Sequence, residues 1–236
     1  PMVFDYIHRK LDDTDVYFVC NQSDREATAE CLFRATGRVP ELWNPLTGDI
    51  QDAPDYSQMG ERTRVSTSFA PYGSWLVVFR KAGRPSATSP ARTFATLCQV
   101  EGPWNVTFTS PWGNAFATTM TELGDWSQNP DDRIRYHSGK GIYECSFEIP
   151  ANEPDLTLEL GRVEDVGIAR VILNGRDLGI VWTRPFRVDI SSAARHGTNR
   201  LKIEVINSWR NRLIGDRQLP PGQARTSTNI TVAPSW

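Results

Sequence analysis

Residues 205–216, VINSWRNRLIGD, place an indole ring, two amides, two guanidinium groups and a carboxylate within one short stretch. A sugar-binding surface combines these groups, because an apolar ring packs against the sugar while polar groups bond its hydroxyls. Trp209, Arg210 and Asn211 are therefore candidate sugar contacts. The same residues would also serve to fix a loop by internal contacts or to meet a partner domain, and these two alternatives stay open.

Two further tryptophans stand beside polar residues that would bond hydroxyls. Trp126 follows Asp125, and Trp182 precedes Arg184 by two positions. We add Trp126, Trp182 and Arg184 to the candidate sugar contacts, since binding residues concentrate on loops that a rigid scaffold presents. The alternative for any one of the eight tryptophans is that it fills the core of a β-sandwich.

Glycoside hydrolysis needs two carboxyl groups, one on either side of the scissile bond. The weak catalytic candidates, which lie outside obvious strand faces, are Asp125, Glu164, Asp165 and Asp216. Glu164 and Asp165 are adjacent and would point to opposite sides of an extended chain, which argues against them as a pair. A solvated or turn-capping role is the simpler interpretation of each.

Composition excludes several other kinds of site. The four cysteines, Cys20, Cys31, Cys98 and Cys145, lack the Cys/His spacing of a zinc site, so we expect no metal. No glycine-rich loop has the strand–turn–helix context of a phosphate site, and we expect no cofactor. A net charge of −2 gives no reason to expect nucleic acid or an anionic membrane as partner, and no apolar run is long enough to span a bilayer.

Short apolar runs separated by turn residues predict an all-β chain built from antiparallel sandwiches, because no βαβ alternation occurs. We expect residues 15–20 and 29–35 to form a hairpin, with Cys20 and Cys31 opposite each other as two thiols or as a disulfide. Residues 73–80 should form a strand that closes a small sheet. A Gly/Pro/Ser-rich stretch, KAGRPSATSPAR, then indicates a crossing between two domains.

After this crossing the strand pattern returns. Tyr143, Cys145 and Phe147 alternate with polar residues and should face the core. Asn174-Gly175 predicts a tight hairpin turn, because both residues tolerate positive φ. Residues 189–197 read as a helix. The expected domains are a small sandwich over 1–82, a crossing over 83–98, and a jelly roll with an irregular tail over 99–236.

Several motifs carry a resemblance to glycoside hydrolases. Residues 158–190, which contain VILNG and a PF before VDI, resemble with residues 197–216 the galactose-binding-like jelly roll of family 2 enzymes. The whole chain resembles the C-terminal part of family 106, the α-L-rhamnosidase type, through motifs in matching order: HRKLDDTDVYFVCNQ, GRVPELWNPLTGDI, GPWNVTF, LGDWSQNPDDRIRYHSGKGIYECSF and SWRNRLIGDRQLP. The resemblance implies a carbohydrate partner, either a terminal sugar or a glycan, and a bacterial periplasmic or secreted setting.

The resembled enzymes hold their catalytic glutamates in a (β/α)₈ barrel, for which this chain lacks the length and the βα alternation. No catalytic residue is therefore carried over. We expect an ancillary sugar-binding or supporting region that is not catalytic by itself. Two alternatives stay open: a self-sufficient exo-glycosidase with a carboxylate pair, and an interaction module that completes a barrel on another chain. The expected protein partner is a catalytic domain or a second copy.

Overall fold

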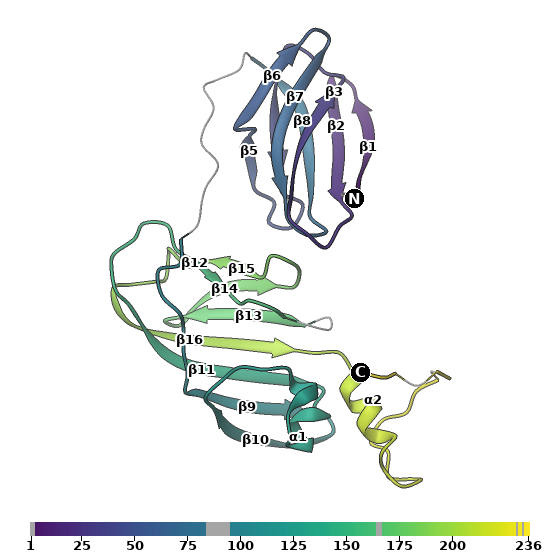
Figure 1. Ribbon diagram of the computed structural model, residues 1–236, viewed down its shortest axis with the longest axis vertical. Helices are drawn as coiled ribbons and strands as arrows, with labels where there is room; N and C mark the ends of the chain where they lie inside the picture. Colours follow the sequence, from purple (N-terminus) through teal and green to yellow (C-terminus); the bar gives the residue numbers. More distant parts are fainter. Residues whose placement is uncertain (1–2, 84–94, 164–166, 230, 233) are drawn as a thin grey trace. The chain divides into compact units, whose positions relative to one another are not determined.

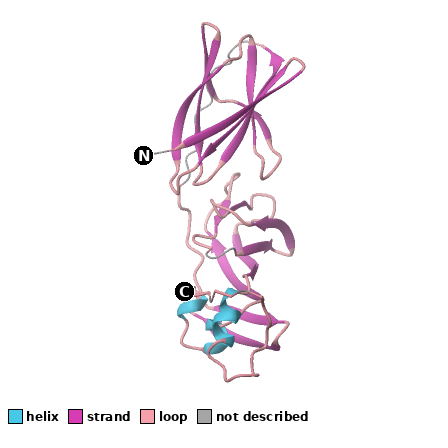
Figure 2. Ribbon diagram, turned by 90° about the vertical axis from the view of Figure 1, so that its right-hand side faces the viewer, coloured by secondary structure: helices cyan, strands magenta, loops and turns pink. Residues whose placement is uncertain are grey.

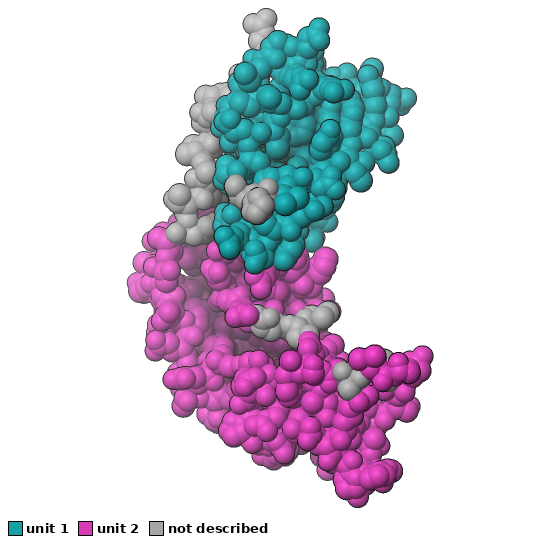
Figure 3. Space-filling model, turned by 45° about the vertical axis from the view of Figure 1, so that its right-hand side comes forward, with its two compact units in different colours: residues 1–94 teal, residues 95–236 magenta. Residues whose placement is uncertain are grey.

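The computed structural model describes residues 3–83, 95–163, 167–229, 231–232 and 234–236. The chain divides into two compact units, Pro1–Phe94 and Ala95–Trp236 (Figure 3). Most of the crossing expected over residues 83–98 lies outside the described residues. No helix of the described part is long and apolar enough to cross a membrane. Strands dominate both units, so the predicted all-β sandwich class is confirmed (Figure 1).

Unit 1 consists of two antiparallel sheets that share one hydrophobic core. The five-stranded sheet has the order β1 (Phe4–Leu11), β2 (Thr14–Asn21), β8 (Ser74–Ala82), β4 (Arg38–Trp43), β5 (Ile50–Asp52). The three-stranded sheet has the order β3 (Ala27–Phe33), β7 (Arg62–Phe69), β6 (Asp55–Met59). Side chains from both sheets fill the space between them, among them Leu42, Val65, Phe69, Val77 and Phe79.

The expected hairpin between β2 and β3 is wrong. β2 pairs with β1 and β8, whereas β3 pairs with β7 in the other sheet. Cys20 and Cys31 therefore lie in different sheets, and both are free thiols. The strand expected over residues 73–80 is confirmed as β8, but it lies between β2 and β4 in the middle of its sheet instead of closing the sheet. Its continuous apolar run suits this central position.

Unit 2 is built on a six-stranded antiparallel sheet with the order β10 (Gly113–Met120), β9 (Trp104–Ser110), β11 (Lys140–Ile149), β16 (Gly197–Ile206), β13 (Ile168–Leu173), β14 (Arg176–Val181). A second sheet pairs β12 (Thr157–Glu159) with β15 (Arg187–Asp189). Tyr143 and Phe147 of β11 are buried and Cys145 packs against the same core, as the alternation predicted. All helices of the described residues lie in this unit: η1 (Trp126–Gln128), α1 (Asp132–Arg135) and α2 (Arg210–Asp216) (Figure 2).

The predicted turn at Asn174-Gly175 is confirmed. Both residues have positive φ, 52° and 83°, and they join β13 to β14 with Leu173 opposite Arg176. The helix expected over residues 189–197 is wrong. Only one turn forms, in which Ala193 and Ala194 N–H donate to the Ile190 carbonyl oxygen. On either side of it, Ser191 N–H donates to the Asp189 carboxylate, and the Asn199 side chain accepts from Arg195 N–H and donates to the Arg195 carbonyl oxygen. Such local side-chain bonds compete with helix formation.

Candidate carbohydrate-binding site

Two loops meet at one end of the six-stranded sheet. Lys140, at the start of β11, pairs with Thr109 near the end of β9 and with Ile206 at the end of β16. The β9–β10 turn and the segment after β16 therefore leave the sheet at the same end. This places the rings of Trp112 and Trp209 edge to face, with 4.9 Å between centroids and 89° between planes.

Asn207 fixes the path of the chain as it leaves β16. Its amide nitrogen donates to the carbonyl oxygen of His137 at 2.9 Å, and its side-chain oxygen accepts from Gly139 N–H at 3.0 Å. These bonds link the exit of β16 to the segment before β11. Trp209 is held next to Trp112 in this way, yet 56% of its surface stays exposed.

A buried ion pair lies behind this aromatic pair. Arg212 Nε and Asp216 Oδ1 are 2.9 Å apart, one turn apart on α2, in a charge contact without directional hydrogen-bond geometry. Asp216 Oδ2 accepts from the backbone N–H groups of Arg225 and Thr226 and from the Thr226 hydroxyl. Burial alone would raise the pKa of Asp216, but these donors and the Arg212 charge together lower it. Asp216 is thus an ionised anchor for the tail.

The tail held by Asp216 brings the guanidinium group of Arg225 to the aromatic pair. Arg225 Nη1 donates to the carbonyl oxygen of Trp112 at 3.2 Å. Arg210 Nε donates to the carbonyl oxygen of Ser235 at 3.0 Å. We call Trp112, Trp209 and Arg225 the aromatic cluster. It combines exposed indole surface with a cationic donor, which is the composition of a small polar-ligand site.

Trp126 and Asp125, paired as candidates by the sequence, serve the fold. Trp126 is only 9% exposed, contacts Phe108 edge to face and donates through Nε1 to the Tyr143 hydroxyl. Gly141 permits this packing, since a Cβ there would lie 2.7 Å from the indole ring. Asp125 is exposed and caps η1 by accepting from Ser127 N–H at 2.8 Å. Little of the Trp126 ring is left for a sugar.

Trp182 and Arg184 are exposed and leave the sheet at the same end as Trp209. Trp182 is 59% exposed and follows β14, the edge strand of the sheet. Ala169 of β13 pairs with the end of β14 on one side and with the end of β16 on the other. At the usual spacing between strands these two ends are about 10 Å apart, whereas β14 and β9, which leads to Trp112, are about 19 Å apart. The end of β14 is thus nearer to the exit of β16 than to that of β9.

Asn211 and two of the four candidate carboxylates, Asp125 and Asp216, have roles in holding the fold. Asn211 is buried in α2. Asp216 is committed to the tail and Asp125 to a cap, as described above. Glu164 and Asp165 lie outside the described residues. Among the described residues no group of three or more His, Cys, Asp or Glu side chains is placed to hold a metal ion.

Comparison with known proteins finds similarity to glycoside hydrolases. The model of glycoside hydrolase family 106, alpha-L-rhamnosidase, matches residues 2–58. The rhamnosidase from Novosphingobium sp. PP1Y matches all of this chain, with a TM-score of 0.85 and 32% identity. The resemblance to family 106 is confirmed. A Formosa agariphila protein provisionally named beta-glucuronidase is 34% identical over 170 residues, which is 70% of this chain.

The chain corresponds to only a small part of each of these two relatives. It spans 23% of the Novosphingobium rhamnosidase. It spans 14% of the Formosa agariphila protein. The likeness to the rhamnosidase nevertheless runs through both units, because it covers 100% of this chain.

Proposed function

We propose that this chain is an ancillary carbohydrate-binding and supporting region of a glycoside hydrolase, and that it is not catalytic by itself. The observation that carries the proposal is the whole-length likeness to one part of a rhamnosidase, at a TM-score of 0.85. Within the proposal, unit 2 is a jelly roll of the galactose-binding-like type. Its strand order and the motifs of residues 158–190 support this assignment.

The aromatic cluster is the proposed sugar contact. The exposed face of Trp209 would stack on a pyranose, and Arg225 would donate to ring hydroxyls or to a carboxylate. Both groups are held by a rigid scaffold, because Asn207 and Asp216 fix the segments that carry them. Such preorganisation lowers the entropy cost of binding. Trp182 with Arg184 is a second candidate surface, at the same end of the sheet.

The positions of the two described candidate carboxylates, Asp125 and Asp216, support a non-catalytic role. A general acid must carry a proton at working pH, whereas the pKa of Asp216 is lowered. Asp125 caps a helical turn. The alternatives from the sequence, an exo-glycosidase and a module that completes a barrel on another chain, predict different results in one assay.

The test combines aryl-glycoside hydrolysis with glycan-array binding for the purified chain. The named activities of the relatives make α-L-rhamnosides and β-D-glucuronides the first probes. We expect no hydrolysis and detectable glycan binding. Trp209→Ala should weaken binding by about 1–3 kcal/mol, as for an aromatic hot spot. The matched control is Trp182→Ala, which removes an equally exposed ring elsewhere.

Each alternative result has a clear meaning. Hydrolysis that one carboxylate substitution abolishes, in a variant that stays folded, would establish the exo-glycosidase. Binding lost in Trp182→Ala but kept in Trp209→Ala would move the sugar site to the end of β14. The absence of both hydrolysis and binding would leave the supporting role and remove the sugar site.

A further inference from the structure

The outer face of the five-stranded sheet in unit 1 carries apolar side chains. Tyr17, Val19, Val77 and Phe79 face the core. Phe18 and Leu76 alternate with them and so point to the opposite face. An antiparallel sandwich normally presents polar residues there, and strands that are apolar at every position are typical of sheets covered on both faces. The segments VYFVC and WLVVF have this character.

Strand register joins these side chains into one line. Ile7 pairs with Phe18, Phe18 with Leu76, Leu76 with Trp43, and Trp43 with Ile50. Directly paired residues share a face, so an unbroken apolar row crosses all five strands. Ile7 and Ile50, at the two ends of this row, are exposed. We call these five residues the apolar row.

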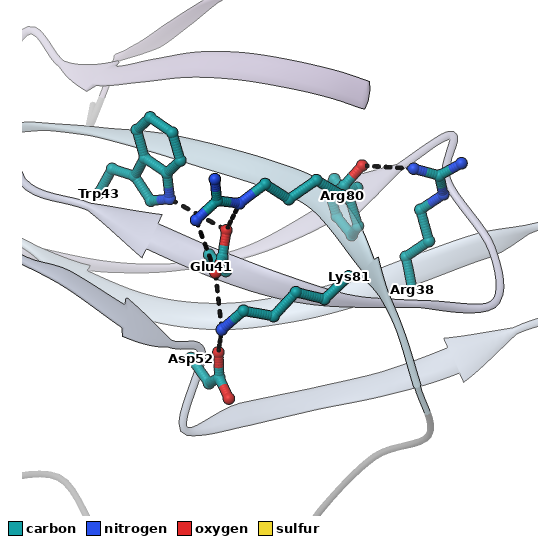
Figure 4. A network of polar contacts seen from close by, with 7 residues as sticks. Arg38, Glu41, Trp43, Asp52, Arg80 and Lys81 are labelled. Atoms are coloured by element: carbon teal, nitrogen blue, oxygen red, sulfur yellow. Dashed lines mark hydrogen bonds and ion pairs between the residues drawn. The ribbon is translucent and has the colours of Figure 1, made fainter. Parts of the chain in front are cut away.

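A charge network around one buried carboxylate flanks the row. Glu41 has no exposed surface, although it lies on the outer face of the sheet beside Trp43. Its carboxylate contacts Arg80 Nε and Lys81 Nζ, both at 2.7 Å, and accepts from Trp43 Nε1 at 3.2 Å (Figure 4). Lys81 also contacts Asp52 at 2.9 Å. Two cations thus balance two carboxylates.

This network gives the face the character of a protein interface. The Arg80 guanidinium lies 4.9 Å from the centroid of the Trp43 ring and stays half-exposed. Arginine and tryptophan are enriched at interface centres, where stacked and already paired side chains lose little freedom on binding. The fitting partner presents an apolar surface, with an oxygen acceptor opposite Arg80.

We infer that the apolar row packs against a further domain of a family 106-type polypeptide, beyond the two units described. This rests on the proposed supporting function. The family model matches residues 2–58, which contain four of the five strands of the sheet. Most of the related rhamnosidase lies outside the match, since the chain covers 23% of it. A domain of that remainder is the proposed occupant.

The size of the face favours a domain of the same polypeptide over a second copy. The five strands are 3 to 9 residues long, which gives a face of roughly 540 Å² on each side, or about 1,100 Å² buried in total. Contacts between domains of one chain bury about 600–1,500 Å². Free partners usually bury about 1,200–2,000 Å² in total, so a second copy would fall short of that range even if the whole face were covered.

Cys20 provides a probe of the face. It follows Phe18 by two positions on β2, pairs with Asp5 and Ser74, and carries a free thiol. Cys98 is an exposed free thiol outside unit 1 and serves as the internal reference. The experiment compares iodoacetamide labelling of both cysteines, resolved by peptide mass spectrometry, in two proteins. One is this chain; the other is the Novosphingobium rhamnosidase with its matching part replaced by this chain.

We expect Cys20 labelling, relative to Cys98, to be at least tenfold slower in the chimera. Phe18→Lys should restore fast labelling in the chimera and leave the melting temperature of the isolated chain unchanged. Leu32→Lys, on the outer face of the other sheet, should change neither. Equal Cys20 labelling rates in the two proteins would overturn the inference, because they would show that no domain of the chimera covers the face.

A second copy gives a distinct signature. Cys20 labelling that slows as the isolated chain is concentrated would show that self-association covers the face, and would overturn the domain assignment. The glycan-array result for Trp209→Ala does not depend on any of these outcomes. Failure of this inference and failure of the proposed sugar site are therefore distinguishable.

Discussion

Arg212 and Asp216 form a buried ion pair, 2.9 Å apart on successive turns of α2, and the same carboxylate holds the backbone of Arg225 and Thr226. The pair therefore links the helix to a tail that is 9 and 10 residues further along the chain. The dense polar sequence after β16 is explained largely by this link. Its charged residues mostly hold the chain in place, whereas Trp209 is exposed.

Replacing Asp216 should release this tail. In Asp216→Asn the Arg212 charge loses its partner within a largely buried site, so the free energy of unfolding should fall by about 3 kcal/mol. Chemical denaturation measures the fall, and limited proteolysis should show faster cleavage within residues 217–229. Asp177→Asn, which breaks an exposed pair with Arg170, is the control and should leave both readouts unchanged. Equal effects of the two substitutions would contradict the anchoring role.

The two tryptophans that the sequence could not separate should respond differently. Trp126→Ala removes a ring from the core of unit 2 and should cost about 3–5 kcal/mol of stability. Trp209→Ala removes an exposed ring whose edge-to-face contact with Trp112 is worth about 0.5–1.5 kcal/mol beyond area burial. Denaturation of both variants checks this order. A Trp209 variant as unstable as the Trp126 variant would assign Trp209 to the core.

Gly175→Val should destabilise unit 2 by about 1 kcal/mol or more, because a β-branched residue resists a φ of 83°. A Cβ at Gly175 would meet nothing within 4 Å, so the cost is conformational rather than steric contact. Gly124→Val is the matched control: that site is equally open and has no positive φ. Thermal unfolding that shifts equally for the two variants would contradict the turn assignment.

Local patterns in the sequence were sufficient for part of unit 2, although β10 was not predicted. Alternation located the buried side of β11, and Asn174-Gly175 located a turn, because both signals depend on neighbouring residues alone. The pairing of β2 was not local in this sense. Its hairpin partner is the largely exposed strand FDYIHRKL, whose composition resembles a surface segment, and its other neighbour β8 lies more than fifty residues away.

The candidate site also contains residues that local sequence patterns identified and residues that they did not. Trp209 was identified because polar groups surround it in the sequence. Trp112 and Arg225 were not chosen, although they complete the cluster, because their contact spans 113 residues and depends on the tail held by Asp216. Trp126 was chosen as a candidate sugar contact, but the structure buries its ring, since a polar neighbour in the sequence does not reveal which way a ring points. Helix α2 was missed because its residues read as a binding loop.

Acid should weaken the fold by protonating two carboxylates, Glu41 and Asp216. Burial alone would raise the pKa of Glu41, but donation from Arg80, Lys81 and Trp43 lowers it overall; Asp216 behaves in the same way. A group with a lowered folded pKa stabilises the protein above its unfolded pKa, and this contribution is lost as pH falls through the folded value. The pKa values of these carboxyl groups in the unfolded chain are about 4, so the loss of stability should begin at about pH 5 and continue below about pH 4.

The melting temperature should therefore be level near neutral pH, as far as these groups determine it, and fall steeply in acid. Glu41→Gln keeps an acceptor of similar size but cannot ionise, so this variant should start from a lower melting temperature at pH 7 and lose less of it on acidification. Glu153→Gln, on an exposed residue, should follow the parent curve. Differential scanning calorimetry between about pH 7 and pH 2.5 checks both slopes. Parallel curves for Glu41→Gln and the parent would show that Glu41 ionisation contributes nothing to the acid sensitivity of unit 1.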